Sequence, residues 1–448
     1  AHDLTATKAK YPAATIIGEF GGQLSGSGDR LVLSDANGNP ADVVEYFDGG
    51  NWPILADGGG SSLELVDPNA DNSKPGAWAA SDETGKSVWQ TFTHEDVARN
   101  LNGDPTQYNE FIFGLLDEGS FLIDDISVIE DPGGDNIEMI QNGDFSGGSA
   151  DKWRLLGTHR HGQVVSDPSQ PGNNVLRMDA TGSTEHMHNH AETTFANGER
   201  ITSSATYRYS FRARWLGGSN KLHTRLYFNR IPRSNLLPVP ENLGTPGLAN
   251  STAVANHGPT YSGLIHSPAV PPANTPFTVS VNAADPDGVT KLELHYSVDG
   301  AAFQTAAMAS ADGTKFVGTI PAQAADSIVQ FYVEGTDAKG AASLEPWKGP
   351  DSRALIRVDD GEAEDLDFIN NFRITMTEAD ATFLHEVTNV MSNDRLGATV
   401  IYNESEIYYN CGVRLKGSQR GRNTQVRVGF NVAFPPEKPF LSAHRTVG

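Results

Sequence analysis

Alternating apolar residues, repeated in short segments between turns, constrain the fold of this chain more than any other feature. Between residues 266 and 358 the alternating segments are FTVSVNAADPDG, VTKLELHYSVDG, TKFVGTIPA and IVQFYVEGTDAKG. A period of two places every second side chain on one face of an extended strand. Turns spaced roughly ten residues apart join such strands into paired antiparallel sheets. We therefore predict one antiparallel β-sandwich over residues 266–358.

Composition extends this prediction to the whole chain. Its 448 residues exceed one ordinary domain, and 46 Gly and 25 Pro supply many tight turns. No stretch of about 18 apolar residues is present, so we expect no membrane span. The predicted chain is a mainly β array of several domains.

Charge and cysteine content exclude several kinds of partner and site. The formal net charge of −23 repels nucleic acid and anionic membranes, so neither is expected as a bulk partner. The single cysteine, Cys411, leaves no internal disulfide framework and no Cys-based zinc site.

Shifts in composition divide the chain into four units and two linkers. A Pro- and Asn-rich stretch and the acidic run DDGEAEDLD lack periodicity and are predicted as linkers. The predicted units are 1–87, 88–230, 266–358 and 368–448, and the predicted linkers are 231–265 and 359–367.

The first unit combines a hairpin pattern with short strand motifs. RLVLSDANGNPADVVEYF alternates on both sides of an Asn-Gly-Asn-Pro turn, which predicts a β-hairpin. Together with DGGGSSLEL and the ending Trp78-Ala-Ala-Ser81, this order resembles the lamin tail domain, an immunoglobulin-like sandwich. Most of that family's first strands have no counterpart here, so the resemblance implies an N-terminally truncated copy.

The second unit carries GSFLIDDISVIED (119–131) and IQNGDFSGG (140–148). Both resemble carbohydrate-binding jelly rolls of the galactose-binding-like group. In those domains the second motif opens the domain and the first closes it, so the reversed order suggests a circular permutation. The resemblance also implies a structural calcium, for which the candidate ligands are Asp124, Asp125 and Asp144; solvated acidic side chains are the plain alternative.

A sugar site requires an exposed aromatic side chain flanked by polar groups. In the second unit we take Trp153 and Trp215 as candidate platforms and His159, His161 and Glu185 as candidate polar contacts. Aromatic residues in strands are more often part of the core, which is the alternative for both tryptophans.

Three histidines at alternate positions, His186, His188 and His190, form the densest cluster of potential ligands. On a strand they share one face, and three imidazoles suit zinc, copper or nickel. The same residues also suit a polar ligand groove or a surface without a site. All three interpretations stay open on the sequence alone.

The last unit has FRITM before a helical stretch, with Thr377 as a plausible N-cap, then ATVIYN, YYNCGVRLKG and FNVAF. This order resembles the N-terminal part of the CotH kinase family. It implies that a complete domain binds ATP and Mg²⁺, with Arg414, Lys416 and Arg420 as candidate phosphate contacts. A basic hairpin on a solvated edge is the alternative.

The acidic segment of that family lies downstream of its V-R-L-K-G strand, and no such segment follows here. Ser392-Asn393-Asp394-Arg395 lies upstream, where a turn is the expected structure. We therefore expect no complete catalytic site in this chain.

The third unit, residues 266–358, looks like an immunoglobulin or fibronectin type III module, which usually serves as a spacer. The predicted fold is thus an array of immunoglobulin-like and jelly-roll sandwiches with a C-terminal α+β portion. We expect an exported bacterial protein, extracellular or in the cell envelope, that binds a polysaccharide or cell-surface component. The alternatives are the targeting half of a CotH-type kinase and a histidine-based metal-binding envelope protein.

Overall fold

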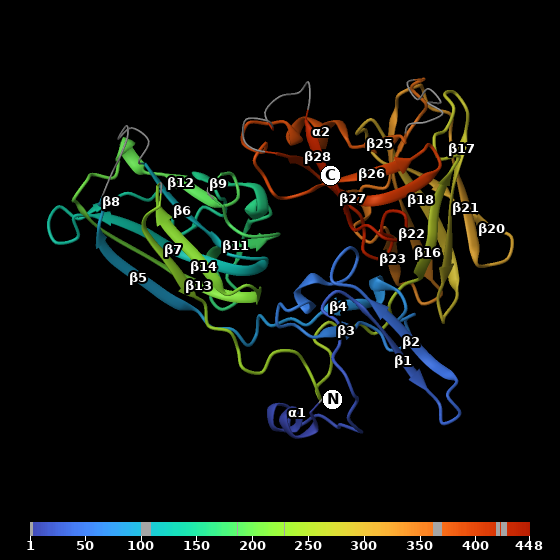
Figure 1. Ribbon diagram of the computed structural model, residues 1–448, viewed down its shortest axis with the longest axis horizontal. Helices are drawn as coiled ribbons and strands as arrows, with labels where there is room; N and C mark the ends of the chain where they lie inside the picture. The colour runs from blue at the N-terminus through green and yellow to red at the C-terminus, as the bar shows by residue number, and fades with distance from the viewer. Residues whose placement is uncertain are drawn as a thin grey trace.

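A computed structural model describes residues 3–99, 109–185, 187–227, 229–361, 370–417, 422 and 428–448. The chain is mainly β, as predicted, and forms four units (Figure 1). The second unit lies at the left of the view, the first at the bottom, the third at the right and the fourth between them at the top. Among the described residues, no helix has the length and apolar character needed to cross a membrane.

Two antiparallel sheets build the second unit. The first sheet has the order β10 (Gln163–Ser166), β11 (Asn174–Ala180), β7 (Gly119–Glu130), β13 (Thr206–Gly218) and β5 (Gln90–Val97), with β8 (Ile137–Glu138) beside β7. The second has the order β15 (Arg230–Leu236), β14 (Lys221–Leu226), β6 (Glu110–Leu115), β12 (Ala191–Thr194) and β9 (Trp153–Leu155). Strands from before and after residue 131 share both sheets, as the permutation hypothesis requires.

Alternation along the longest strand of this unit builds its core. In β13, Tyr207, Tyr209 and Phe211 are buried, and the residues between them are partly exposed. They share one core cluster with Phe121 of the neighbouring strand β7 and with Phe111 and Phe113 of β6 in the other sheet. The burial of aromatic side chains of this size makes the main favourable contribution to the free energy of folding of such a sandwich.

The predicted linker 231–265 is wrong at both ends. Residues from Arg230 on form β15, and β16 already begins at Thr260. Pro232 explains why the strand escaped prediction, because proline lacks the N–H that a ladder needs and weakens the strand pattern. β15 tolerates it as the edge strand of its sheet.

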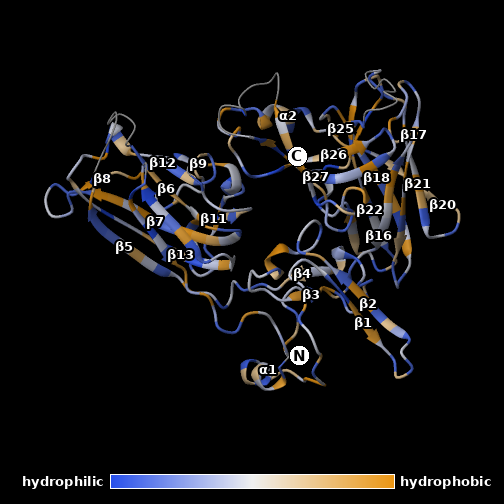
Figure 2. Cartoon of the chain, in the orientation of Figure 1, coloured by the Kyte–Doolittle hydropathy of each residue, from blue (hydrophilic) through white to orange (hydrophobic). Residues whose placement is uncertain are grey.

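The first unit forms two ribbons instead of the predicted sandwich. Its elements are α1 (Leu4–Lys10), β1 (Asp29–Ser34), β2 (Pro40–Tyr46), β3 (Leu63–Leu65) and β4 (Trp78–Ala80). β1 pairs with β2 and confirms the predicted hairpin, but only β3 and β4 pair otherwise. Figure 2 shows hydrophobic positions on β1 and β2, and Leu33 there is 65% exposed.

A buried carboxylate fastens the first unit to the segment after β15. Glu64 is 2% exposed and accepts hydrogen bonds from the hydroxyls of Thr245, Ser251 and Thr252. Burial alone would raise the pKa of Glu64, but these donors hold it below its usual value. Polar contacts with another part of the chain thus replace the missing second sheet.

The third unit is an antiparallel sandwich, as its alternation predicts. One sheet has the order β16 (Thr260–Ser267), β17 (Phe277–Ala284), β21 (Lys315–Ile320) and β20 (Ala309–Ser310). The other has β19 (Gln304–Ala307), β18 (Val289–Val298), β22 (Ile328–Asp337) and β23 (Ala342–Glu345), with β24 (Leu355–Arg357) beside β22.

The described part of the fourth unit contains one sheet and helix α2 (Glu378–Leu384). Its strands lie in the order β25 (Phe372–Thr375), β26 (Leu396–Tyr402), β27 (Glu406–Lys416), β28 (Gly429–Ala433) and β29 (Thr446–Val447). Helix α2 (Glu378–Leu384) follows β25, and the Thr377 hydroxyl accepts the Asp380 N–H at 3.1 Å, which confirms the predicted N-cap. The unit adjoins the third unit, where the Leu355 N–H donates to the Thr399 hydroxyl.

Candidate functional site: a cleft between the four units

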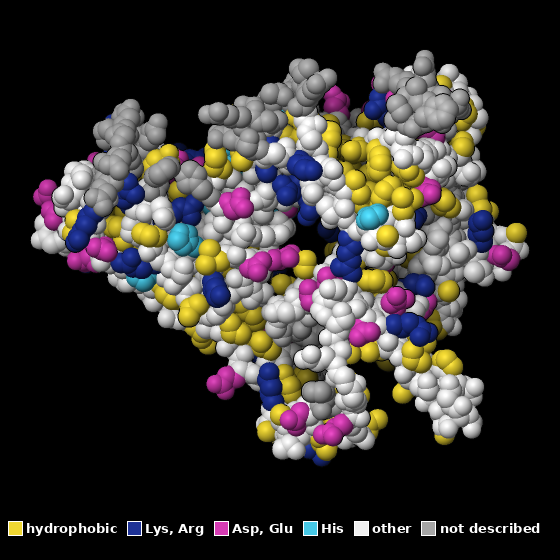
Figure 3. All heavy atoms as spheres, in the orientation of Figure 1, with side chains coloured by type: hydrophobic (Ala, Val, Ile, Leu, Met, Phe, Trp, Pro, Cys, Tyr) yellow, Lys and Arg dark blue, Asp and Glu magenta, His cyan; other side chains and the backbone are white. Residues whose placement is uncertain are grey.

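A polar cavity of about 730 Å³ lies where the four units meet. We call it the central cleft. Figure 3 shows a hollow near the middle of this face, with basic and acidic side chains along its rim. The lining side chains on which the site depends are Asn51 from the first unit, Arg160, His161 and Thr181 from the second, Trp347, Lys348 and Arg353 from the third, and Asp394 and Arg395 from the fourth.

Asp394 connects the second and fourth units across this cleft. Its carboxylate accepts hydrogen bonds from Arg160 Nε at 2.5 Å and Thr181 Oγ1 at 2.6 Å, and His161 Nε2 lies at 3.0 Å. Burial alone would raise its pKa, but the hydrogen bond and charge of His161 and the charge of Arg160 hold the pKa below its usual value. The predicted turn at 392–395 is therefore an interdomain contact.

Asn189 adds a second contact between the same two units. Its side-chain oxygen accepts the Asn393 N–H at 2.8 Å, and its amide donates to the Met391 carbonyl at 3.1 Å. The guanidinium of Arg160 also lies 5.6 Å from the centre of the Phe383 ring. Several directional contacts therefore set how these two units meet.

Trp347 is the exposed aromatic side chain at the cleft. It is 52% exposed, although large aromatics usually bury most of their surface. The Lys348 ammonium lies 5.2 Å from the centre of its ring. Trp347 also lines a second cavity of about 460 Å³, together with Glu345, Glu437 and Asn51. We call this second cavity the acidic pocket.

An exposed indole among charged and amide side chains can bind a ligand in two ways. The ring face packs on an apolar face of the ligand, and the polar groups bind its hydroxyls or charges. The cavity volumes fall in the usual range for small-ligand sites, about 300–1,000 Å³. The exposed indole and the surrounding polar groups therefore suit the binding of a small ligand that has both an apolar face and polar groups.

The two tryptophans predicted as sugar platforms lie in the core, so that prediction is wrong. Trp153 is 7% exposed and its indole donates to the Asn142 carbonyl, while Trp215 is 1% exposed and donates to the Gly218 carbonyl. Their rings offer no face to a ligand. Of the polar candidates, His161 lines the central cleft, His159 is fully buried and Glu185 is exposed.

The histidine cluster is not a strand face. Glu185 pairs with Asn189 in an isolated bridge, and His188 between them has a left-handed backbone with φ of 55°. His188 therefore lies in a tight turn and not on an extended strand, so the strand alternation that predicted a shared face does not hold for His188 and His190. His186 lies outside the described residues.

The two buried histidines have their ring nitrogens engaged. His190 Nδ1 lies 2.9 Å from the Glu185 carbonyl and Nε2 lies 2.7 Å from the Glu192 carboxylate. His159 Nε2 accepts the Leu115 N–H at 2.9 Å, and burial lowers the pKa of His159 to about 3. Because these contacts use the nitrogens a metal would need, the two histidines stabilise the sandwich.

Two of the three calcium candidates, Asp124 and Asp125, lie around an arginine. Arg212 Nη2 is 2.5 Å from Asp124 and Nε is 2.9 Å from Asp125, so the guanidinium occupies the position of a cation between them. Asp144 is exposed and accepts from the backbone and hydroxyl of Ser146. Arg212 thus neutralises Asp124 and Asp125 in part, while Asp124 Oδ1 stays buried without a hydrogen-bond partner among the described residues, so the calcium site remains a prediction.

A different acidic set lies on the third unit. Among the described residues, one group of three or more His, Cys, Asp or Glu side chains has its ligand atoms within 4.8 Å of one another: Asp285, Asp287 and Asp337. Lys339 already pairs with Asp287 at 2.8 Å, and Asp337 accepts from Asn256 and two backbone N–H groups. Most of its oxygens are thus satisfied by the protein.

One basic candidate of the fourth unit, Arg414, lies close enough to the central cleft for its charge to act on Arg395. Arg414 donates to the Asn393 side chain at 3.3 Å, and Lys416 is exposed at the end of β27. Arg420 lies outside the described residues. The charge of Arg414 acts on Arg395, which lines the cleft and whose pKa is lowered first by burial and then by that charge.

Comparison with known proteins does not assign this chain to a family. No family model and no curated protein matches the chain. Solved structures that it resembles include a DUF4785 family protein from Legionella pneumophila, at 4% identity and TM-score 0.18 over 74% of this chain and 73% of that one. A Ca²⁺-stabilised adhesin from an Antarctic bacterium matches at 11% sequence identity and a TM-score of 0.17. That match covers 73% of this chain and 93% of the adhesin chain.

An engineered protein gives 16% identity and a TM-score of 0.17, and the match covers 27% of this chain and only 24% of that protein's length. TM-scores of this size carry no argument about fold or function.

The sequence pattern did not point to Trp347, and it assigned Asp394 to a turn without a partner. Trp347 lies in the segment EPWKGP, between two prolines and outside any alternating strand. A tryptophan in a turn bounded by prolines has no adjacent strand whose side chains could bury its ring. This position in a turn is the sequence feature that suggests an exposed Trp347. Asp394 offers no such hint, because its partners lie more than 200 positions away.

Proposed function

We propose that this chain is a binding module array that holds a glycan in the central cleft, with Trp347 as the stacking surface. The single observation that carries the proposal is the 52% exposed indole of Trp347 beside a cleft lined by charged and amide groups. Asn51, Arg160 and Arg353 supply hydrogen-bond donors for sugar hydroxyls. The proposal includes export to the cell envelope or beyond, where polysaccharide targets occur. The jelly-roll resemblance of the second unit supports it.

Replacing Trp347 with alanine is expected to weaken glycan binding at least about 10-fold, because a buried aromatic anchor contributes roughly 2 kcal/mol or more to such a site. Binding is measured by calorimetry on ligands selected from a glycan array. Trp347→Phe keeps a ring and should retain most of the affinity. Phe20→Ala is the control, since Phe20 is also an exposed aromatic, 45% exposed. Equal affinity of Trp347→Ala and wild type would contradict the proposal.

Anion binding by a CotH-like fourth unit is a second candidate function. The observation that favours it is a group of arginines without carboxylate hydrogen-bond partners among the described residues. Arg395 donates to Asn431 at 2.7 Å, Arg414 donates to Asn393, and Arg422 Nε donates to the Gly417 carbonyl. Arg422 is 9% exposed, and its Nη1 is buried without a hydrogen-bond partner. Phosphate oxygens would supply the missing acceptors.

We expect inorganic phosphate and ATP to raise the unfolding temperature of the chain, and Arg414→Gln to reduce that rise. One charge-assisted hydrogen bond contributes about 1.5–3 kcal/mol, so affinity should fall about 10-fold or more. Thermal shift and calorimetry measure both effects. Arg30→Gln, an exposed arginine of the first unit, is the matched control. Stabilisation that is the same in Arg414→Gln and Arg30→Gln would remove this second function.

A further inference from the structure

Two carboxylates face the acidic pocket without a cation. Glu345 comes from the end of β23 in the third unit, and Glu437 comes from the fourth unit. Among the described residues neither forms an ion pair. Glu437 Oε1 accepts the Asn51 amide at 2.7 Å, whereas Oε2 is buried and has no hydrogen-bond partner there. A buried carboxylate oxygen without a donor is costly, so Glu437 Oε2 lacks a positively charged or donating partner.

The protonation behaviour of this pair agrees with the geometry. Burial, and then the charge of Glu437, raise the pKa of Glu345 to about 7. Burial also raises the pKa of Glu437, against the effect of the Asn51 hydrogen bond. Like charges in a partly desolvated place disfavour ionisation, and a cation between them reverses that effect.

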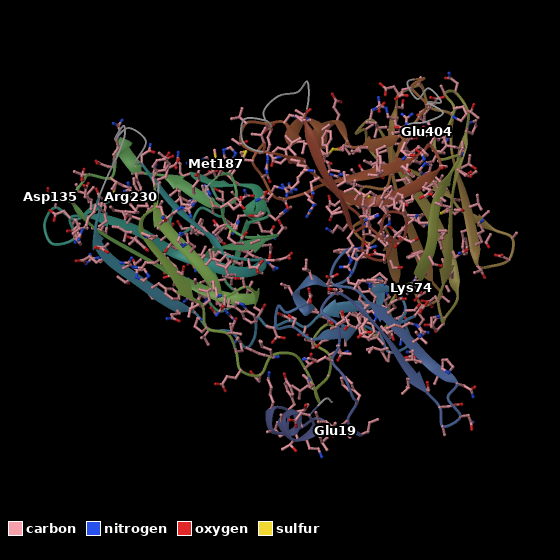
Figure 4. The ribbon with its side chains drawn as sticks, viewed as in Figure 1. Glu19, Lys74, Asp135, Met187, Arg230 and Glu404 are labelled. Atoms are coloured by element: carbon pink, nitrogen blue, oxygen red, sulfur yellow. The ribbon has the colours of Figure 1, made fainter. Side chains whose placement is uncertain are left out.

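The other titratable groups of the pocket do not provide that cation. The Lys74 ammonium lies 4.0 Å from Asp71 on its own turn, and Lys74 is labelled in Figure 4 where the first unit meets the third. Burial lowers the pKa of His257, so its imidazole is neutral at pH 7. Burial raises the pKa of Tyr261 to about 12, and its hydroxyl donates to the Ser343 carbonyl.

Trp347 forms another wall of the same pocket. A cation gains free energy over an indole face as well as beside carboxylates. The volume of about 460 Å³ accommodates a monosaccharide-sized group, and the pocket shares Trp347 and Asn51 with the central cleft. A ligand stacked on Trp347 therefore reaches both cavities.

We infer that the acidic pocket selects glycans that carry a free primary amine, which Glu345 and Glu437 bind as an ammonium ion next to Trp347. This inference rests on the proposed glycan-binding function and names its ligand class. An ammonium group has three N–H donors, enough for the free Glu437 Oε2 and for Glu345. An acetylated amine has no charge and only one N–H donor, so it cannot neutralise the pair or satisfy both carboxylates.

The test compares a glucosamine trimer with its N-acetylated counterpart by calorimetry at pH 7. We expect wild type to bind the amine form at least 10-fold more tightly and to release protons on binding, because the ligand lowers the pKa of the carboxyl pair. The double variant Glu345→Gln, Glu437→Gln should bind both trimers equally and release no protons. Glu241→Gln, at an exposed glutamate outside the pocket, should behave as wild type.

Each other outcome has a definite meaning. Wild type that binds both trimers equally overturns the amine selectivity and leaves the glycan-binding function standing. Binding of neither trimer, with no other glycan bound on an array, overturns both. Butylamine that binds as tightly as the glucosamine trimer shows an amine site without glycan selectivity and overturns the inference as well. Unchanged circular dichroism in the double variant excludes misfolding as the cause of lost selectivity.

Discussion

Asp394→Asn is expected to separate the second unit from the fourth. The Asp394 side chain is 6% exposed and carries the ion pair with Arg160, the contact with His161 and the bond from Thr181. Breaking a buried ion pair by removing one partner costs about 3–5 kcal/mol. We expect about 3 kcal/mol here, since Arg160 and His161 keep partial contact with water. That loss is large because Asp394 makes three of the contacts that join the two units.

Small-angle scattering should show a larger radius of gyration for Asp394→Asn, and thermal unfolding should resolve separate transitions for the two units. Asp179→Asn is the matched control: Asp179 also lines the central cleft, but it pairs with Arg177 and Ser120 within the second unit. An unchanged radius of gyration in Asp394→Asn would show that other contacts hold the units together.

The same contact predicts a pH dependence. Because the folded pKa of Asp394 lies below the unfolded value, its stabilisation is complete above the unfolded pKa of about 3.9 and is lost as the pH falls through the lower folded value. We therefore expect the scattering profile to stay constant from pH 7 to about pH 5 and the radius of gyration to rise only in stronger acid.

Local patterns were sufficient to predict the alternating strands of the third unit. In β22 buried and partly exposed residues alternate along the whole strand, and β17 does the same, because the period of two follows from backbone geometry. The N-cap at Thr377 was likewise predictable, since a cap involves residues only three positions apart. Structural features that depend on residues a few positions apart can be predicted from the sequence.

The candidate site depends on long-range contacts, and these have no local pattern. Trp153 and Trp215 had the right side chain for a platform, but the neighbouring strands bury them. Trp347 has the same side chain in a turn between units and stays exposed. Which tryptophan faces a ligand is decided by how the units pack, and packing follows from contacts such as Asp394 with Arg160.

The histidines illustrate the same limit on a smaller scale. Alternation from His186 to His190 predicts convergence only on an extended strand. The structure has a turn there, with Asn189 used as an interdomain contact and His188 in a left-handed conformation. Periodicity cannot distinguish a strand from an irregular loop over five residues.

Arg212→Gln is expected to destabilise the second unit by about 3–5 kcal/mol, because it leaves buried carboxylates without their cation. Asp124 and Asp167 are 1% and 4% exposed, and Arg212 Nη2 contacts both, at 2.5 and 3.3 Å. The guanidinium also lies 4.3 Å from the centre of the Trp89 ring, a cation–π contact that glutamine cannot replace. Hydrogen exchange should show faster exchange of amides in β7 and β13.

Arg208→Gln on the same strand is the matched control. Arg208 is 39% exposed and lies 3.9 Å from Glu95, and an exposed pair of this kind contributes less than about 1 kcal/mol. Calcium provides a second measurement. With Arg212 present, 1 mM calcium (roughly the range in which extracellular modules bind it) should not slow exchange in β7. In Arg212→Gln, Asp124, Asp125 and Asp167 lose their shared cation, and calcium should restore part of the protection. Calcium-dependent protection of β7 in the wild type would instead mean that these carboxylates bind the ion beside Arg212.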